Sequence, residues 1–140
     1  MFILDTNILS AMMRLNRVPE VAGWLDAQDE QQLFTTTVSQ AEVLSGLAIM
    51  ADGRRRREFE KTAREMFDEF EERILPFDSD AAKSYAALFA LRRQAGRPTA
   101  PQDLMIAAIA RANGGCMVTR NTSDFEGCGL PLINPWDEHG

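Results

Sequence analysis

Short apolar segments alternate with longer segments of helical periodicity along this chain, and this alternation limits the possible folds more than any other feature. Between the apolar runs, apolar residues recur at steps of three and four, as in amphipathic helices. Such alternation favours an α/β fold in which a parallel sheet is flanked by helices. We expect a single domain over residues 1–140. Strands are predicted at 2–4, 32–38, 74–77, 116–119 and 132–133.

Helix starts are marked by capping residues and prolines. Ser39 and Glu42 have the spacing of a capping box, in which Ser39 accepts a backbone hydrogen bond and Glu42 reaches back. In the charged segment from 54 to 73, apolar residues at helical spacing predict an amphipathic helix. Its apolar side, which continues to residue 74, is a candidate interface with another protein. Other helix starts are expected at 5–7, Pro19, 78–79 and Pro101.

Four acidic residues follow predicted strands or begin predicted helices: Asp5, Glu42, Asp103 and Asp124. Ligands of parallel sheets bind beyond the carboxyl ends of the strands, so we expect these side chains to converge at one edge. The helix macrodipole also favours acids in a first turn, which is the structural alternative for Glu42 and Asp103. Asp5 ends a buried strand, where an unpaired carboxylate is costly.

Clustered carboxylates repel one another unless a cation lies between them. Oxygen ligands without histidine or cysteine favour Mg²⁺ or Mn²⁺ over zinc. The only histidine, His139, lies in the C-terminal tail, and Cys116 and Cys128 do not have zinc-site spacing. We find no nucleophile–histidine pair, P-loop or dinucleotide fingerprint. The chemistry that remains is metal-assisted displacement at a phosphate.

The motifs of the chain, in their order, resemble those of the PIN-domain family, and more narrowly the VapC and FitB toxins of bacterial toxin–antitoxin pairs. The last segment is similar to the FitB-like subgroup. The segments that carry the resemblance are Phe2–Asn7, Ser39–Glu42 with Gly46, Gln102–Ala108, Val118–Phe125 and Leu132–Trp136.

The resemblance implies a PIN-like three-layer fold and a nuclease that hydrolyses RNA with Mg²⁺ or Mn²⁺. Asp5 and Asp103 would be the principal metal ligands. Glu42 would be the third acid, binding metal directly or through water and orienting the attacking water. Many family members have an acid where this chain has Asn121, whereas Asp124 matches the aspartate of a following Asp-Phe pair.

The same resemblance implies polar roles for Thr6, Asn7 and Thr119, which would position Asp5 or contact phosphate. It also implies a cognate antitoxin that covers the toxin groove, binding of operator DNA only through that antitoxin, and assembly into a homodimer or a larger complex. With no apolar run long enough to span a bilayer and no signal peptide at 1–7, we expect no membrane contact and a cytoplasmic protein.

The net charge of −6 means that RNA must be held by a local basic patch or by bound metal. Arg120 is the favoured single phosphate contact, because it lies near the predicted site. The basic run 54–57, with Lys61 and Arg64, fits a solvated helix face about as well as an RNA or partner contact. Unranked candidates are Arg14, Arg17, Arg92, Arg93 and Arg97.

Three other functions fit the sequence less well. A phosphohydrolase with an aspartyl nucleophile requires a second acid two residues after Asp5, where this chain has Asn7. A receiver domain requires a lysine late in the chain, and the only lysines are Lys61 and Lys83. The main alternative is a degenerate PIN module that acts by forming a complex with antitoxin and operator, although the presence of Asp5, Glu42 and Asp103 argues against degeneracy.

Overall fold

The computed structural model describes residues 1–14 and 18–137 and contains a five-stranded sheet in which every strand pairing is parallel. The strand order is β3-β2-β1-β4-β5, so the first strand is central. The chain builds β2 and β3 on one side of β1, then crosses to build β4 and β5 on the other. The strands are β1 (Phe2–Leu4), β2 (Leu33–Thr36), β3 (Ile74–Leu75), β4 (Cys116–Val118) and β5 (Leu132–Ile133).

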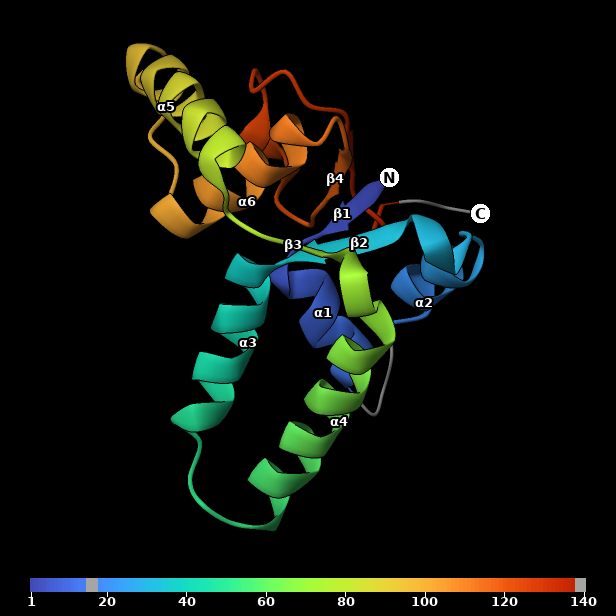
Figure 1. The fold of residues 1–140 in the computed structure, drawn as a ribbon. Helices are drawn as coiled ribbons and strands as arrows, with labels where there is room; N and C mark the ends of the chain where they lie inside the picture. Colours follow the sequence, from blue (N-terminus) through green and yellow to red (C-terminus); the bar gives the residue numbers. More distant parts are fainter. Residues whose placement is uncertain (15–17, 138–140) are drawn as a thin grey trace.

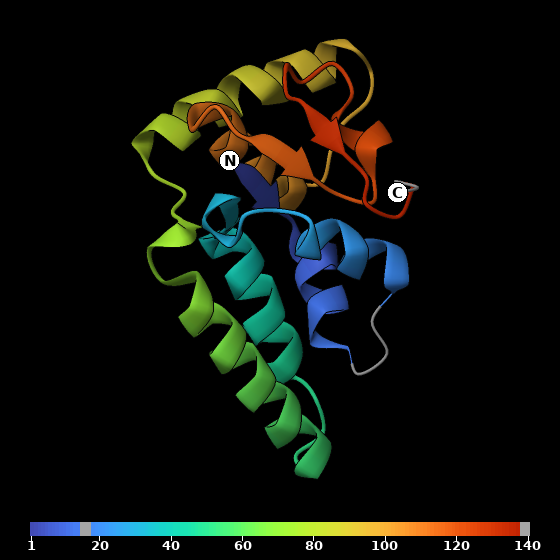
Figure 2. The same cartoon turned by 90° about the vertical axis from the view of Figure 1, so that its right-hand side faces the viewer.

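Helices cover both faces of this sheet (Figures 1 and 2), which gives the expected α/β architecture. The α-helices are α1 (Thr6–Met13), α2 (Pro19–Asp26), α3 (Thr37–Ala48), α4 (Arg54–Phe70), α5 (Ser79–Gln94) and α6 (Pro101–Ala112). Short 3₁₀ turns are η1 (Glu30–Gln32), η2 (Glu71–Arg73) and η3 (Thr122–Phe125). None of the helices in the described ranges is long and apolar enough to cross a membrane.

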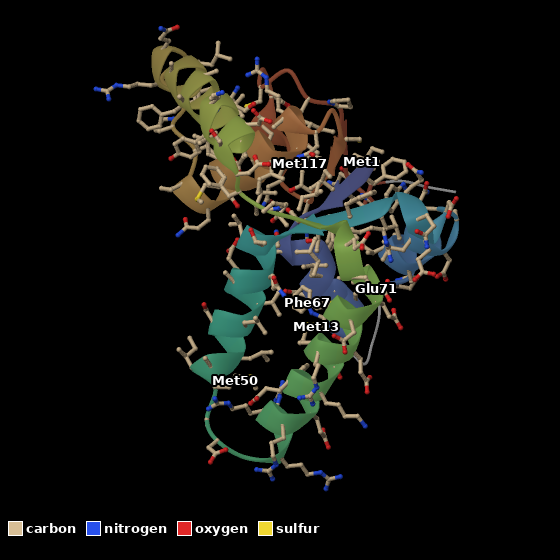
Figure 3. All side chains as sticks on the ribbon, in the orientation of Figure 1. Met1, Met13, Met50, Phe67, Glu71 and Met117 are labelled. Carbon is tan, nitrogen blue, oxygen red and sulfur yellow. The ribbon has the colours of Figure 1, made fainter. Side chains whose placement is uncertain are left out.

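The central strand supplies side chains alternately to two hydrophobic cores, because successive residues of a strand point to opposite faces. Leu4 packs in a core with residues of α1, α3 and α4, whereas Ile3 packs in a core with residues of α5 and α6. Phe67 of α4 is buried in the first core, between α3 and α4 in Figure 3. The fold therefore has three layers.

The apolar side of α4 is not an exposed interface, contrary to the prediction. Its residues Ala63, Met66, Phe67 and Phe70 are buried inside the first core. The periodicity located the apolar stripe correctly, but a stripe alone does not distinguish packing within the chain from packing against another chain. The helix also ends at Phe70 and gives way to η2 rather than continuing to residue 73.

The second strand and the start of α3 also differ from the prediction. The strand covers Leu33–Thr36 instead of 32–38, and α3 begins directly afterwards at Thr37. The N-cap is Thr36, whose hydroxyl oxygen accepts a 3.0 Å hydrogen bond from the amide of Ser39. Ser39 and Glu42 therefore do not form the predicted capping box, because threonine at the strand end caps the helix three residues earlier.

Candidate functional site

Asp5 lies at the carboxyl end of β1, at the point where the strand order reverses between β1 and β4. In open parallel sheets this crevice is where ligands bind. The Asp5 carboxylate accepts a 3.2 Å hydrogen bond from the amide of Ile8, and the side chain of Thr119 and the amide of Asn7 also favour its ionised form. Burial, at 7% exposure, nevertheless raises the pKa of Asp5 to about 6, and the charge of Asp103 adds to the shift.

Glu42 is held towards the same site by α1. The hydroxyl of Thr6 donates a 3.0 Å hydrogen bond to Oε1 of Glu42 and so connects the first residue of α1 to α3. Because α3 begins at Thr37, Glu42 lies in its second turn and not in the first. The helix macrodipole therefore does not explain an acid at position 42, since its effect decays within the first turn.

Asp103 connects the other acids electrostatically. It lies half-buried in the first turn of α6, and this burial raises the pKa of its carboxyl. The negative charges of Glu42 and Asp124 raise the pKa of Asp103 further, and Asp103 in turn raises that of Asp5. The charge of Asp103 thus interacts with the charges of the three other predicted acids, and we refer to these four residues as the acidic cluster.

The loop after β4 places Asp124 and Asn121 differently. Asp124 is exposed in η3, and its carboxylate acts on Asp103. Asn121 is also exposed, and its backbone amide donates a 3.1 Å hydrogen bond to Oγ1 of Thr119. Thr119 is fully buried, and its side chain interacts with the carboxylate of Asp5. Asp124 is therefore the residue of this loop whose charge reaches the cluster.

Arg120 is exposed beside the cluster and packs on the C-terminal segment. Its guanidinium lies 5.1 Å from the centre of the Trp136 ring, a cation–π arrangement. Its backbone carbonyl accepts a 3.1 Å hydrogen bond from Nδ2 of Asn134. These contacts hold Arg120 next to Thr119 at the end of β4. The candidate Arg17 and the tail residue His139 lie outside the described residues.

The basic run at the start of α4 is largely paired along its own helix. Ion pairs join Arg54 to Glu58 at 3.0 Å and Arg56 to Glu60 at 2.7 Å, each spanning four residues. Such exposed pairs are typical of a solvated helix face. Arg55 differs, because its guanidinium lies 5.6 Å from the centre of the Phe59 ring.

A groove of about 570 Å³ begins at Thr6 and Glu42 and extends away from the cluster. Arg14 and Arg55 also line it, so the groove combines a carboxylate with two guanidinium groups. The other lining residues are Ser10, Met13, Val43, Gly46, Leu47, Met50 and Phe59. The arrangement offers an extended chain both charged and apolar contacts next to the acids.

The donor set of the cluster fits a hard divalent cation. Carboxylate oxygens are the ligands that Mg²⁺ and Mn²⁺ prefer. Burial and mutual repulsion raise the pKa values of Asp5 and Asp103, so a positive charge would stabilise their ionised forms. Within residues 1–14 and 18–137, however, no group of three or more acidic, histidine or cysteine side chains is placed so that it could hold a metal ion as it stands.

Threonines at the end of β2 form hydrogen bonds that support the site, whereas the sequence pattern predicts only a strand there. Oγ1 of Thr35 donates a 2.9 Å hydrogen bond to the carbonyl of Leu4, the residue before Asp5. Thr35 is fully buried, so this bond fixes the end of β1 from the neighbouring strand. The available signal was the unusual run of threonines 35–37 at a strand end.

A family model described as "PIN domain" matches residues 2–126. The chain is 40% identical over 138 residues to the VapC ribonuclease Y4jK of Sinorhizobium fredii, an alignment covering 98% of this chain and 99% of that protein. It is 30% identical over 139 residues to Toxin FitB of Neisseria gonorrhoeae, covering 99% of this chain and 100% of FitB. The sequence resemblance noted above therefore extends over the whole length of both relatives.

Solved structures show the same likeness. The structure of FitAB bound to an IR36 DNA fragment superposes with a TM-score of 0.93 at 29% identity, covering 100% of this chain and 99% of that chain. A toxin–antitoxin complex from Klebsiella pneumoniae shares the fold, with a TM-score of 0.72 at 24% identity, covering 96% of this chain and 98% of that chain. The chain therefore belongs to the PIN-domain family of nucleases, among its VapC- and FitB-like members.

Proposed function

We propose that this protein is a metal-dependent endoribonuclease toxin, in which residues 1–140 act as a single PIN domain in the cytoplasm. The observation that carries the proposal is the interaction of Asp103 with Glu42, Asp124 and Asp5 at the switch point of the sheet. Neighbouring carboxylates disfavour one another's ionised form, and a bound cation would relieve this repulsion. The name of the relative Y4jK, a VapC ribonuclease, supports RNA as the substrate.

In this proposal Asp5 and Asp103 would hold Mg²⁺ or Mn²⁺, Glu42 would bind it directly or through water, and Asp124 would lie at the outer side of the cluster. A divalent ion held by these residues would supply Lewis-acid polarisation of the phosphodiester and would activate water as a nucleophile. Oε1 of Glu42 accepts the hydrogen bond from Thr6, which leaves Oε2 to orient the attacking water and accept its proton. Thr119 and the start of α1 keep Asp5 in position through the hydrogen bonds to its carboxylate.

RNA would be held by local arginines, in spite of the net charge of −6. Arg14 and Arg55 line the groove that begins at Glu42 and would contact phosphates there. Arg120 would contact a phosphate on the β4 side of the cluster. Bound metal would add to the attraction, since a divalent ion offsets part of the acidic charge.

The proposed partners are a cognate antitoxin that restrains the nuclease, a second copy of the chain, and operator DNA bound through the antitoxin. The similarity to Toxin FitB and to the FitAB structure, which contains a DNA fragment, supports this assembly. A second role as a module that acts only by complex formation is the alternative that the following experiment separates.

The test is induced expression in a bacterium without the antitoxin, followed by sequencing of RNA 5′ ends. We expect growth arrest and new, discrete 5′ ends from the wild-type protein, and neither from Asp103→Asn. Asp80→Asn is the matched control, because Asp80 is an exposed acid in the first turn of α5. If the stable wild-type protein leaves the RNA ends unchanged, the nuclease proposal is wrong and the binding module is favoured.

A further inference from the structure

Arg92, near the end of α5, is a buried cation outside the acidic cluster. Only 6% of it is exposed, although arginine is seldom buried without a partner. Among residues 1–14 and 18–137 it forms no ion pair with a carboxylate. Instead, Nε donates a 2.9 Å hydrogen bond to Oγ1 of Thr99, and Nη1 donates a 3.0 Å bond to the carbonyl of Glu126. Burying a charge without a carboxylate partner is costly, so these two hydrogen bonds are the interactions that offset the burial of Arg92.

The hydroxyl of Thr99 connects Arg92 to the loop that carries Asp124. It accepts the hydrogen bond from Arg92 and donates a 3.3 Å bond to the backbone carbonyl of Asp124. Arg97 adds a second link, because its Nη2 donates a 3.2 Å bond to the carbonyl of Ser123. Figure 2 shows the end of α5 and the connector after it beside the segment that follows β4.

The same connector leads directly into the helix of Asp103. The carbonyl of Ala100 accepts the 3.0 Å hydrogen bond from the amide of Leu104 in the first turn of α6. Thr99 therefore joins the backbone of Asp124 to the chain four residues before Asp103. No other hydrogen bond from a threonine side chain in the described residues connects these two segments.

We propose that Arg92 and Thr99 are positioning residues that hold the Asp124 loop against the start of α6 and thereby set the separation of the Asp103 and Asp124 carboxylates. Neither side chain touches the substrate in this proposal, and both act through Asp124. The inference rests on the proposed metal-dependent function for its effect on ion binding. Its effect on the loop does not depend on that function.

Thr99→Val is the sharpest test, because valine has the shape of threonine but neither accepts nor donates a hydrogen bond. Thr99→Ser keeps both abilities and is the rescue variant. Thr62→Val is the matched control, since Oγ1 of Thr62 also donates to a backbone carbonyl, that of Glu58, but on the exposed side of α4. Two readouts are needed: hydrogen–deuterium exchange of the metal-free protein, and binding of Mn²⁺ by titration calorimetry.

We expect Thr99→Val to speed amide exchange in residues 120–128 and to weaken Mn²⁺ binding about tenfold, because the Asp124 carboxylate is no longer held near Asp103. Thr99→Ser and Thr62→Val should match the wild type in both readouts. Unchanged exchange in 120–128, or faster exchange with unchanged Mn²⁺ affinity, would overturn the proposal. If the wild type binds no Mn²⁺ and cleaves no RNA, the proposed function fails instead, and the exchange result alone decides whether Thr99 positions the loop.

Discussion

The hydroxyl of Thr6 donates a 3.0 Å hydrogen bond to Oε1 of Glu42, and this contact ties the start of α1 to the second turn of α3. Thr6 directly follows Asp5 at the end of the central strand. The first residues of α1 therefore orient two acids: the amide of Ile8 binds Asp5, and the hydroxyl of Thr6 binds Glu42. The geometry makes Thr6 a determinant of the site even though it carries no charge.

Replacing Thr6 with valine should lower RNA cleavage about fivefold to tenfold, because loss of the hydrogen bond leaves Glu42 free to leave its position. Thr6→Ser keeps the hydroxyl and should retain most of the activity. Single-turnover cleavage of a labelled RNA measures both rates. Equal rates for the valine and wild-type proteins would show that Thr6 does not orient Glu42 for the reaction.

The Asp5→Asn variant should unfold at higher temperature than the wild type when both are kept metal-free at pH 7. Burial raises the pKa of Asp5 to about 6, so its charged form costs stability at neutral pH. Asparagine removes the charge and still offers an oxygen to the amide of Ile8. We expect a gain of about 1–3 kcal/mol in unfolding free energy, measured by denaturant titration with chelator present. A less stable variant would contradict a destabilising charge at position 5.

The stability of the metal-free protein should depend on pH through the same group. The pKa of Asp5 is raised from 3.8 to about 6 on folding, so the folded state binds more protons than the unfolded state between these values. The contribution of Asp5 is therefore fully present below pH 4 and is lost as the pH rises to about 6. Unfolding free energies from pH 4 to pH 7 should fall less steeply for Asp5→Asn than for the wild type. Parallel curves would refute the raised pKa.

Gly115 should not tolerate a side chain, because it packs directly against Ile3 of the central strand. A Cβ atom there would lie 2.9 Å from Cγ1 of Ile3, in the buried central strand. Gly115→Ala should destabilise the protein by about 1–3 kcal/mol through overpacking. Gly23→Ala is the control, because nothing lies within 4 Å of its Cβ position in α2, and it should add about 0.5–1 kcal/mol. Equal melting temperatures for the two variants would contradict the close packing.

Most of the fold followed from local signals. Pro19 and Pro101 open helices as predicted, and Asp5 and Asp78 cap α1 and α5. The predicted boundary after β2 was wrong, because the threonines there suit a strand and a helix cap equally well. The apolar side of α4 was also misjudged, since only tertiary structure decides whether such a stripe packs within the chain.

The sequence predicts that the acids approach one edge of the sheet, but it does not predict the hydrogen bonds that support them. Asp5, Asp103 and Asp124 follow strands or open a helix, and the parallel topology favours one edge for such positions. The links from Thr35 to Leu4 and from Arg92 to Thr99 join residues with no sequence pattern in common. Such bonds arise from the three-dimensional packing of separate elements and leave no periodic signal.

The most direct test of the central claim is cleavage of total bacterial RNA by the purified protein, with Mg²⁺, with Mn²⁺ and with chelator alone. Asp103→Asn and the control Asp80→Asn should be purified and assayed in parallel. We expect discrete fragments from the wild type and from Asp80→Asn that require a divalent metal, and none from Asp103→Asn. Metal-independent fragments, fragments that persist with Asp103→Asn, or no cleavage by the folded, antitoxin-free wild type would contradict the claim.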